Sequence, residues 1–216
     1  MNQYIQEILY NVIFQYLEFY DKHTFQKMNK YTNRIHITDL WHINNKYLHK
    51  LDDDILKNYK RATKLNACNI HKITNINHMT KLKELDASHD CGIDDEGIIN
   101  LINLKLLNAD DNFKLTKINH MTNLRKLDAR GSCGIGDGGL INLNNLEKLK
   151  VSYNSKITNI NHMTKLKELY TTVCNRINDV VLLNILVILT NLLYDFLHNE
   201  NVQDCLIMME YYCLNY

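Results

Sequence analysis

The segment KITNINHMTKLKEL occurs at residues 72–85 and again, unchanged, at residues 156–169. A related segment, KLTKINHMTNLRKL, lies midway between them at residues 114–127. The three copies therefore begin at the equally spaced positions 72, 114 and 156. An internal repeat of this size indicates stacked supersecondary units in which each unit contacts only its neighbours. The repeat therefore decides the fold, and the rest of the chain is interpreted around it.

Each period of the repeat contains two shorter units. An apolar or small residue opens every unit, and the intervals between these residues alternate between 22 and 20 positions: Leu40, Ala62, Leu82, Leu104, Leu124, Leu146 and Leu166. Another apolar residue follows three positions later, and a small or apolar residue stands at position five in five of the seven units. This alternation predicts one short strand per unit with its apolar side chains pointing inward.

The resulting pattern, LxxLxAxxNxxI, resembles the leucine-rich repeat. The resemblance covers residues 40–187 and implies an α/β fold, a solenoid or horseshoe with short parallel strands on its concave face. Asn112 and Asn154 stand at the Asn position, where the side chain hydrogen-bonds backbone groups of the turn after the strand. Ile70 interrupts that series.

The return path differs between the two kinds of unit. Short units continue with apolar residues at a spacing of three, as in Ile73, Ile76 and Met79, which favours an extended or 3₁₀ return. Long units contain segments such as CGIDDEGIINLIN at 91–103, where Asp94 or Asp95 is a plausible helix N-cap. Asp179 is the corresponding residue near the end of the array. We therefore expect a short outer helix in each long unit.

Residues 1–39 do not fit the repeat, and their apolar residues follow a period of 3.6. The stretch from Ile5 to Tyr31 resembles an F-box, although Gln6 stands where that family usually has Pro and Tyr31 replaces a common Trp. The resemblance implies docking on a Skp1-like adaptor, and through it a cullin. The docking residues would be Ile5, Ile8, Leu9, Ile13, Phe14 and Leu17. The alternative is that these helices only cap the solenoid.

Composition limits the remaining possibilities. With 25 basic and 24 acidic residues the net charge is +1, which argues against a nucleic-acid binder. The start of the chain shows no secretory signal, so we expect a cytoplasmic protein. With the F-box and repeat resemblances, the absence of Pro and the excess of Asn, Ile and Lys make the chain similar to the F-box/leucine-rich-repeat proteins of giant DNA viruses (Mimivirus-like) or AT-rich protists.

The last part of the chain is expected to close the array. Residues 188–216 are predicted to form a helical cap over the last unit. Residues 180–197 are apolar at all but four positions and could instead be a membrane anchor. Asn184, Thr190, Asn191 and Asp195 interrupt this stretch, which makes a membrane span the less favoured alternative.

No set of residues predicts catalysis or a cofactor. His78, His120 and His162 recur at one repeat position, but residues two units apart lie ~10 Å apart and do not share a metal ion. Cys91 and Cys133 are likewise too far apart for a disulfide. The Gly-rich stretch at 134–139 lacks the Lys and Ser/Thr of a phosphate-binding loop. We therefore expect neither an enzyme nor a metal protein.

The outward strand positions remain as the candidate site. They change in type from unit to unit while the inward positions repeat, as expected where packing fixes one side and recognition uses the other. The residues predicted to bind a target protein are Lys126, Asp128, Arg130, Lys148, Lys150, Tyr153 and Tyr170. With the F-box resemblance, this predicts the substrate-recognition subunit of a Skp1–cullin–F-box (SCF) ubiquitin ligase. The alternative is a stand-alone leucine-rich-repeat interaction scaffold.

Overall fold

A computed structural model describes residues 38–41 and 50–171 of the 216-residue chain. Three predictions concern residues outside these ranges: the F-box-like helices over 1–37, the possible membrane stretch at 180–197, and the C-terminal cap at 188–216. Within the described residues, no helix combines the length and the apolar character that crossing a bilayer requires. The fold is therefore described for the repeat array alone.

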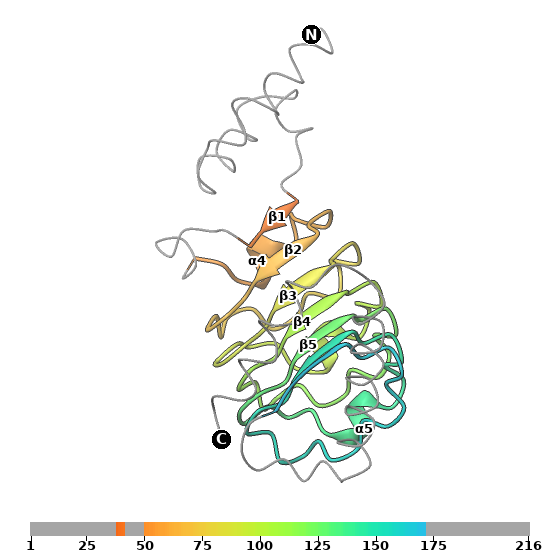
Figure 1. The fold of residues 1–216 in the computed structure, drawn as a ribbon. Coiled ribbons are helices and arrows are strands. Elements are labelled where there is room, and N and C mark those ends of the chain that lie inside the picture. The colour runs from red at the N-terminus through yellow and green to blue at the C-terminus, as the bar shows by residue number, and fades with distance from the viewer. Residues whose placement is uncertain (1–37, 42–49, 172–216) are drawn as a thin grey trace, which may run out of the picture. The chain divides into compact units, whose positions relative to one another are not determined.

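The repeat array is a single parallel sheet in which each unit contributes one strand (Figure 1). The seven strands pair in chain order, so each strand neighbours only the strands of the adjacent units. They are β1 (Asp39–Leu40), β2 (Lys64–Asn66), β3 (Glu84–Asp86), β4 (Leu106–Asn108), β5 (Lys126–Asp128), β6 (Lys148–Lys150) and β7 (Glu168–Tyr170). This arrangement confirms the predicted solenoid of short parallel strands.

The core follows the inward positions of the strands. The central leucines of β2 to β7 pair with one another in register, and all of them are buried: Leu65, Leu85, Leu107, Leu127, Leu149 and Leu169. Burying one such side chain contributes about 1.5–3 kcal/mol relative to leaving it exposed. Because successive strand residues point to opposite faces, the same register leaves the flanking residues of every strand on the other face of the sheet.

The first unit departs from the predicted register. Leu40 pairs with Leu65, so it occupies the central strand position and not the leading position. The spacing from Leu40 to Leu65 therefore exceeds that between any two later central leucines, such as Leu85 and Leu107. Leu51 is nevertheless buried, as predicted for the position aligned with Ile73. The additional residues of this unit thus lie between Leu40 and Leu51.

Each described long unit forms a single turn of helix, in agreement with the short outer helix that we expected. These turns are α4 (Asp53–Leu56), η4 (Glu96–Ile98) and α5 (Asp137–Leu140). Two glycines explain how closely they pack on the unit before: a Cβ on Gly97 would lie 2.0 Å from the Thr74 carbonyl oxygen, and one on Gly139 would lie 2.5 Å from that of Thr116. The short units contain turns and no helix here, as the spacing of three predicted.

Candidate functional site

Three aspartates join each long unit to the short unit after it. Asp95 accepts hydrogen bonds from the Thr116 amide at 2.7 Å, the Thr116 hydroxyl at 2.6 Å and the Lys117 amide at 2.9 Å. Asp53 and Asp137 make the same three contacts with the units that follow them. We call Asp53, Asp95 and Asp137 the aspartate clamps. Sequence reasoning assigned Asp95 only as a possible N-cap, but it is Asp94 that accepts from the Gly97 amide.

The predicted role of the repeat asparagines is confirmed. The Asn154 amide donates to the carbonyl oxygens of Ala129 and Ile135, at 2.8 and 3.0 Å, and its side-chain oxygen accepts from the Lys156 amide. Asn112 makes the equivalent bonds, and both side chains are buried. The contacts reach further than predicted, because they tie the turn of a short unit to the long unit before it.

The three recurring histidines have a structural partner. Nε2 of His78 lies 2.9 Å from the Leu56 carbonyl oxygen, and His120 and His162 make the same contact with Ile98 and Leu140. A carbonyl oxygen only accepts, so Nε2 is the protonated nitrogen that donates. Among the residues that the structure describes, no group of three or more His, Cys, Asp or Glu is arranged to hold a metal ion.

The repeated cysteines are buried in the core. Cys91 and Cys133 have no solvent exposure, and burial raises the pKa of each thiol to about 11. They therefore remain protonated near neutral pH and behave as small apolar side chains, as expected from their repeat position.

The outward strand positions bring most of the predicted target-binding residues together. Lys126 lies beside Lys148, and Asp128 lies beside Lys150, which in turn lies beside Tyr170. We call the set on this part of the sheet the target face: Lys126, Asp128, Arg130, Lys148, Lys150 and Tyr170. Their side chains are half-buried or exposed, in contrast to the inward leucines of the same strands.

Asp128 organises one half of the target face. Its carboxylate accepts from Arg130 Nε at 2.7 Å and lies 3.2 Å from Lys150 Nζ. The Arg130 guanidinium also reaches Asp110, at 2.8 Å. The hydrogen bond to Asp128 raises the pKa of Arg130, so the guanidinium stays charged. Burial raises the pKa of Asp110, while the charge of Arg130 opposes this change.

Lys148 and Tyr170 organise the other half. Lys148 forms an ion pair with Glu168, which raises the pKa of the ammonium and lowers that of the carboxylate. The same ammonium lies 4.7 Å from the centre of the Tyr170 ring, within the range of a cation–π contact. Tyr170 in turn donates its hydroxyl hydrogen to Glu168, at 3.0 Å. These contacts hold the ring and both charges in fixed positions on the surface.

Tyr153, which was also predicted to bind a target, lies beyond the end of β6 and not on a strand. It follows β6 in a turn, with φ of 63°, and 65% of it is exposed. One residue of every turn from β2 to β6 has positive φ at this position: Asn69, His89, Asp111, Gly131 and Tyr153. Asn, Asp, His and Gly tolerate this conformation, whereas a bulky residue rarely adopts it. In the sequence, a residue that tolerates positive φ recurs at the same position after the strands, and Tyr153 is the exception.

Charges separate across the width of the sheet from β2 to β6. The last residue of each strand and the four that follow include five acidic and two basic residues: Asp86, Asp90, Asp110, Asp111, Asp128, Arg130 and Lys150. The first residue of each strand and the three before it include two acidic and eight basic residues: Glu84, Glu147, Arg61, Lys64, Lys81, Lys83, Lys105, Arg125, Lys126 and Lys148. The strand-start edge is therefore basic and the strand-end edge acidic.

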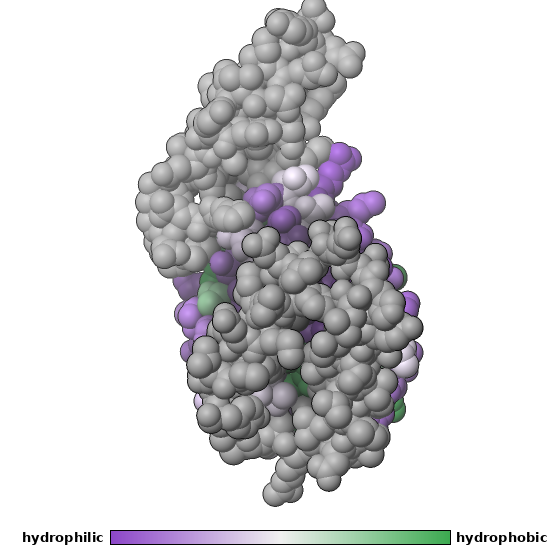
Figure 2. Space-filling model, viewed as in Figure 1, coloured by the Kyte–Doolittle hydropathy of each residue, from purple (hydrophilic) through white to green (hydrophobic). Residues whose placement is uncertain are grey.

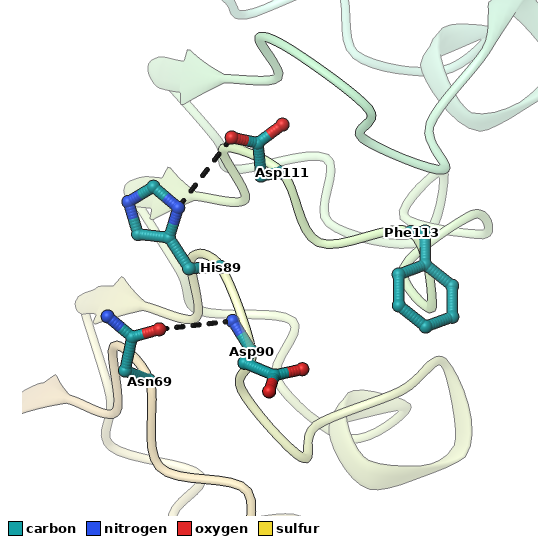
Figure 3. Close-up of a pocket in the computed structure, with 5 residues that line it drawn as sticks. All are labelled: Asn69, His89, Asp90, Asp111 and Phe113. Carbon is teal, nitrogen blue, oxygen red and sulfur yellow. Dashed lines mark hydrogen bonds and ion pairs between the residues drawn. The ribbon is translucent and has the colours of Figure 1, made fainter.

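A shallow hollow lies at the acidic strand-end edge. Its volume is about 380 Å³, and Asn69, His89, Asp90, Asp111 and Phe113 line it (Figure 3). His89 and Asp111 form a pair with Nδ1 and Oδ2 3.7 Å apart. Phe113 is 62% exposed. Such exposure of an apolar side chain is unusual here, because the described surface visible in Figure 2 is mostly hydrophilic, with small, separate hydrophobic patches. Sequence reasoning did not find this hollow, because its residues come from three units.

These features define the class of fold. Over the described residues the chain is a parallel-strand solenoid with one strand per unit, inward leucines and a bridging asparagine, which is the pattern of leucine-rich repeats. No family model and no curated protein matches the sequence.

Similar solved structures include internalins of Listeria monocytogenes. InlF of strain 4b F2365 is 24% identical with a TM-score of 0.45, and the alignment covers 56% of this chain and 37% of InlF. InlC2 of the same strain is 17% identical with a TM-score of 0.45, over 56% of each chain. The functional domain of InlJ, which includes a cysteine ladder, is 17% identical with a TM-score of 0.38, over 56% and 32%. The aligned regions thus span less than two thirds of each of these proteins.

Proposed function

We propose that this chain is a non-enzymatic protein-binding scaffold that holds a partner protein on its target face. The observation that carries the proposal is the contrast between the two sides of β5, β6 and β7. Their central residues are leucine in every strand and are buried. Their outward residues are half-buried or exposed and differ as a set from strand to strand: Lys126 and Asp128 on β5, Lys148 and Lys150 on β6, Glu168 and Tyr170 on β7. Stacking of the units requires only the first pattern, so the second is free to serve recognition.

The charges of the target face indicate the kind of partner. Four of its six residues are basic and one is acidic. Asp128 and Glu168 fix Arg130, Lys148 and Lys150 in place, while Lys126 is exposed at the strand-start edge. Such preformed contacts lower the cost of ordering long side chains on binding. A partner surface that carries acidic groups around a recess for the Tyr170 ring is complementary to this arrangement.

The test is affinity capture from a lysate of the cells that produce the protein. Capture by the wild-type chain is compared with capture by the double variant Lys126→Glu/Lys148→Glu. The matched control is Lys60→Glu/Lys72→Glu, which reverses two exposed charges away from the strands. We expect one acidic partner to be retained by the wild type and the control and lost from the target-face variant. Capture of the same proteins by all three would contradict the proposal.

We further propose that the chain is the substrate-recognition subunit of an SCF ubiquitin ligase in the cytoplasm. The support is the resemblance of Ile5 to Tyr31 to an F-box, followed directly by leucine-rich repeats. In this role Ile8, Leu9, Ile13, Phe14 and Leu17 would bind a Skp1-like adaptor. The chain would contribute proximity alone, by raising the effective concentration of the target near the enzyme that transfers ubiquitin.

This finer proposal is tested by mixing the purified full-length chain with Skp1 and following the complex by size-exclusion chromatography. We expect a complex with the wild type that is lost in Ile13→Asp and Leu17→Asp. The target-face variant should still bind Skp1, since its changes lie on β5 and β6. If the wild type forms no complex, the alternative of a stand-alone scaffold whose N-terminal segment caps the array is favoured.

A further inference from the structure

The hollow beside Phe113 lies outside the target face, and its groups differ in chemistry from that face. Carboxylates of Asp90 and Asp111 line it together with the Phe113 ring. In Figure 3 the His89–Asp111 pair lies on one side, while Asp90 points toward the side on which the Phe113 ring lies. An exposed aromatic ring that lines the same hollow as two carboxylates offers two attractions to one cation, through the face of the ring and through charge.

The walls of the hollow are held by backbone contacts between units. The amides of Asn69, His89 and Asp111 donate to carbonyl oxygens of the following units, at 3.3, 2.7 and 3.2 Å. Asn69 also accepts from the Asp90 amide through its side-chain oxygen, at 3.4 Å. The three residues with positive φ are therefore fixed in place before any ligand arrives. A site that is formed in advance loses less entropy on binding.

Some hydrogen-bonding and charged groups at the hollow already have partners within the protein. Asp111 Oδ1 accepts from the Ser132 amide at 2.8 Å, and the other oxygen faces His89. The Lys114 ammonium lies 5.8 Å from the centre of the Phe113 ring and donates to the Cys91 carbonyl oxygen at 3.1 Å. Two carboxylates and this one ammonium leave the hollow with a net negative charge when His89 is neutral, and a bound cation would balance it.

We propose that this hollow receives an arginine side chain of the partner protein. A guanidinium is planar, so it can lie on the Phe113 ring while its N–H groups face the Asp90 carboxylate, whereas an ammonium is a compact, strongly hydrated charge. The volume of about 380 Å³ lies within the range of small-ligand sites, about 300–1,000 Å³. The proposal that the arginine belongs to a partner protein rests on the proposed scaffold function. The binding of a guanidinium to the hollow does not.

The probe is arginine amide, titrated into the ¹⁵N-labelled full-length chain and followed by NMR. We expect saturable shifts of the amides of Asn69, Asp90, Asp111 and Phe113, with unchanged amides in β6 and β7. Citrulline amide has nearly the same shape without the charge, and lysine amide has the charge without the plane. Both should bind more weakly than arginine amide. Shifts of equal size with citrulline amide, equal affinity for lysine amide, or no saturable shift at tens of millimolar would each overturn the proposal.

Two surface variants with matched controls locate the site. Phe113→Leu should weaken binding about two- to fivefold, as expected for the loss of an exposed cation–π contact. Tyr153→Leu, another exposed aromatic of the same edge, should leave it unchanged. Asp90→Asn should weaken binding by a similar factor, while Glu96→Gln should not. The target-face variant Lys126→Glu/Lys148→Glu should bind arginine amide normally, so failure of this site and failure of the proposed scaffold function give different results.

Discussion

Replacing Asp95 with Ala should destabilise the solenoid at neutral pH, by more than the loss of an ordinary helix cap. The carboxylate accepts three hydrogen bonds from the next unit, at 2.6–2.9 Å. Losing the side-chain acceptor of an N-cap typically costs about 1 kcal/mol and at most about 2 kcal/mol. Asp95 satisfies two amides and one hydroxyl, but water can replace part of these contacts at this accessible site. The upper end of the capping range, about 2 kcal/mol, is therefore the appropriate estimate.

The effect should depend on pH in a defined direction. Partial burial alone would raise the pKa of Asp95. The hydrogen bonds from Lys117 and Thr116 nevertheless hold this pKa below its ordinary value. A carboxyl with a lowered pKa in the folded state stabilises the fold above its unfolded pKa of about 3.9. That contribution is lost as the pH falls through the folded-state pKa. The difference between wild type and Asp95→Ala should thus be full at pH 7 and shrink below about pH 4.

The assay is urea unfolding followed by circular dichroism, with amide hydrogen exchange of Thr116 and Lys117 as the local measurement. Asp95→Asn keeps one acceptor oxygen for the two amides and should lose about half as much stability. Glu96→Ala removes an exposed charge from the same turn and should change stability by less than about 0.5 kcal/mol. The reasoning is refuted if Asp95→Ala behaves like Glu96→Ala, or if its effect is the same at pH 3 and pH 7.

Three further predictions follow from the same contacts. Asn154→Ala should cost more than Asp95→Ala, about 3 kcal/mol in urea unfolding, because it leaves two carbonyl oxygens and one amide without their buried partner. An effect below about 1 kcal/mol, the net worth of a single ordinary hydrogen bond, would contradict this. Tyr153→Asn should raise the stability by about 1 kcal/mol, because φ of 63° suits Asn better than Tyr; a lower urea midpoint would show that the ring stabilises the turn. Finally, native-state hydrogen exchange in low urea should show that a long unit and the short unit after it open together. Equal loss of amide protection at every boundary between units would argue against this.

The repeat array was predictable because stacking requires the same inward residues in every unit. The leucines at the strand centres, the bridging Asn112 and Asn154 and the buried cysteines all follow from residues that recur at fixed spacing. The first unit was placed wrongly because Leu40 also suits the leading position, and only its pairing with Leu65 distinguishes the two registers. The outer helices were predicted as short, but their close packing at Gly97 and Gly139 against the backbone of the unit before was not, because a contact between units is not visible in any single segment.

The candidate site was predictable only in part, for a physical reason. Outward positions on a strand are known as soon as the inward ones are, so Lys126, Lys148 and Tyr170 were found together. Tyr153 was assigned to the same face because Tyr is common among interface anchors, and its residue type does not show that the chain turns through positive φ there. The hollow at Phe113 combines side chains from three turns, and its shape depends on how these turns pack, which spacing alone does not specify.

The long period of the sequence repeat, two units and not one, also has a structural cause. The aspartate clamps, the buried asparagines and the three histidines all connect a long unit to the short unit that follows it. The ammonium groups of Lys114 and Lys156 reach the Cys91 and Cys133 carbonyl oxygens across the same kind of boundary. The sheet continues across every boundary, but these side-chain bonds recur at alternate ones, while Asn77 bonds to Glu96 and Asn100 across the other kind of boundary. A long–short pair is therefore the repeating unit of the aspartate, buried asparagine, histidine and lysine bonds. Keeping these bonds intact requires their residues to recur once per pair, which is the spacing of the KITNINHMTKLKEL segments and of the related segment between them.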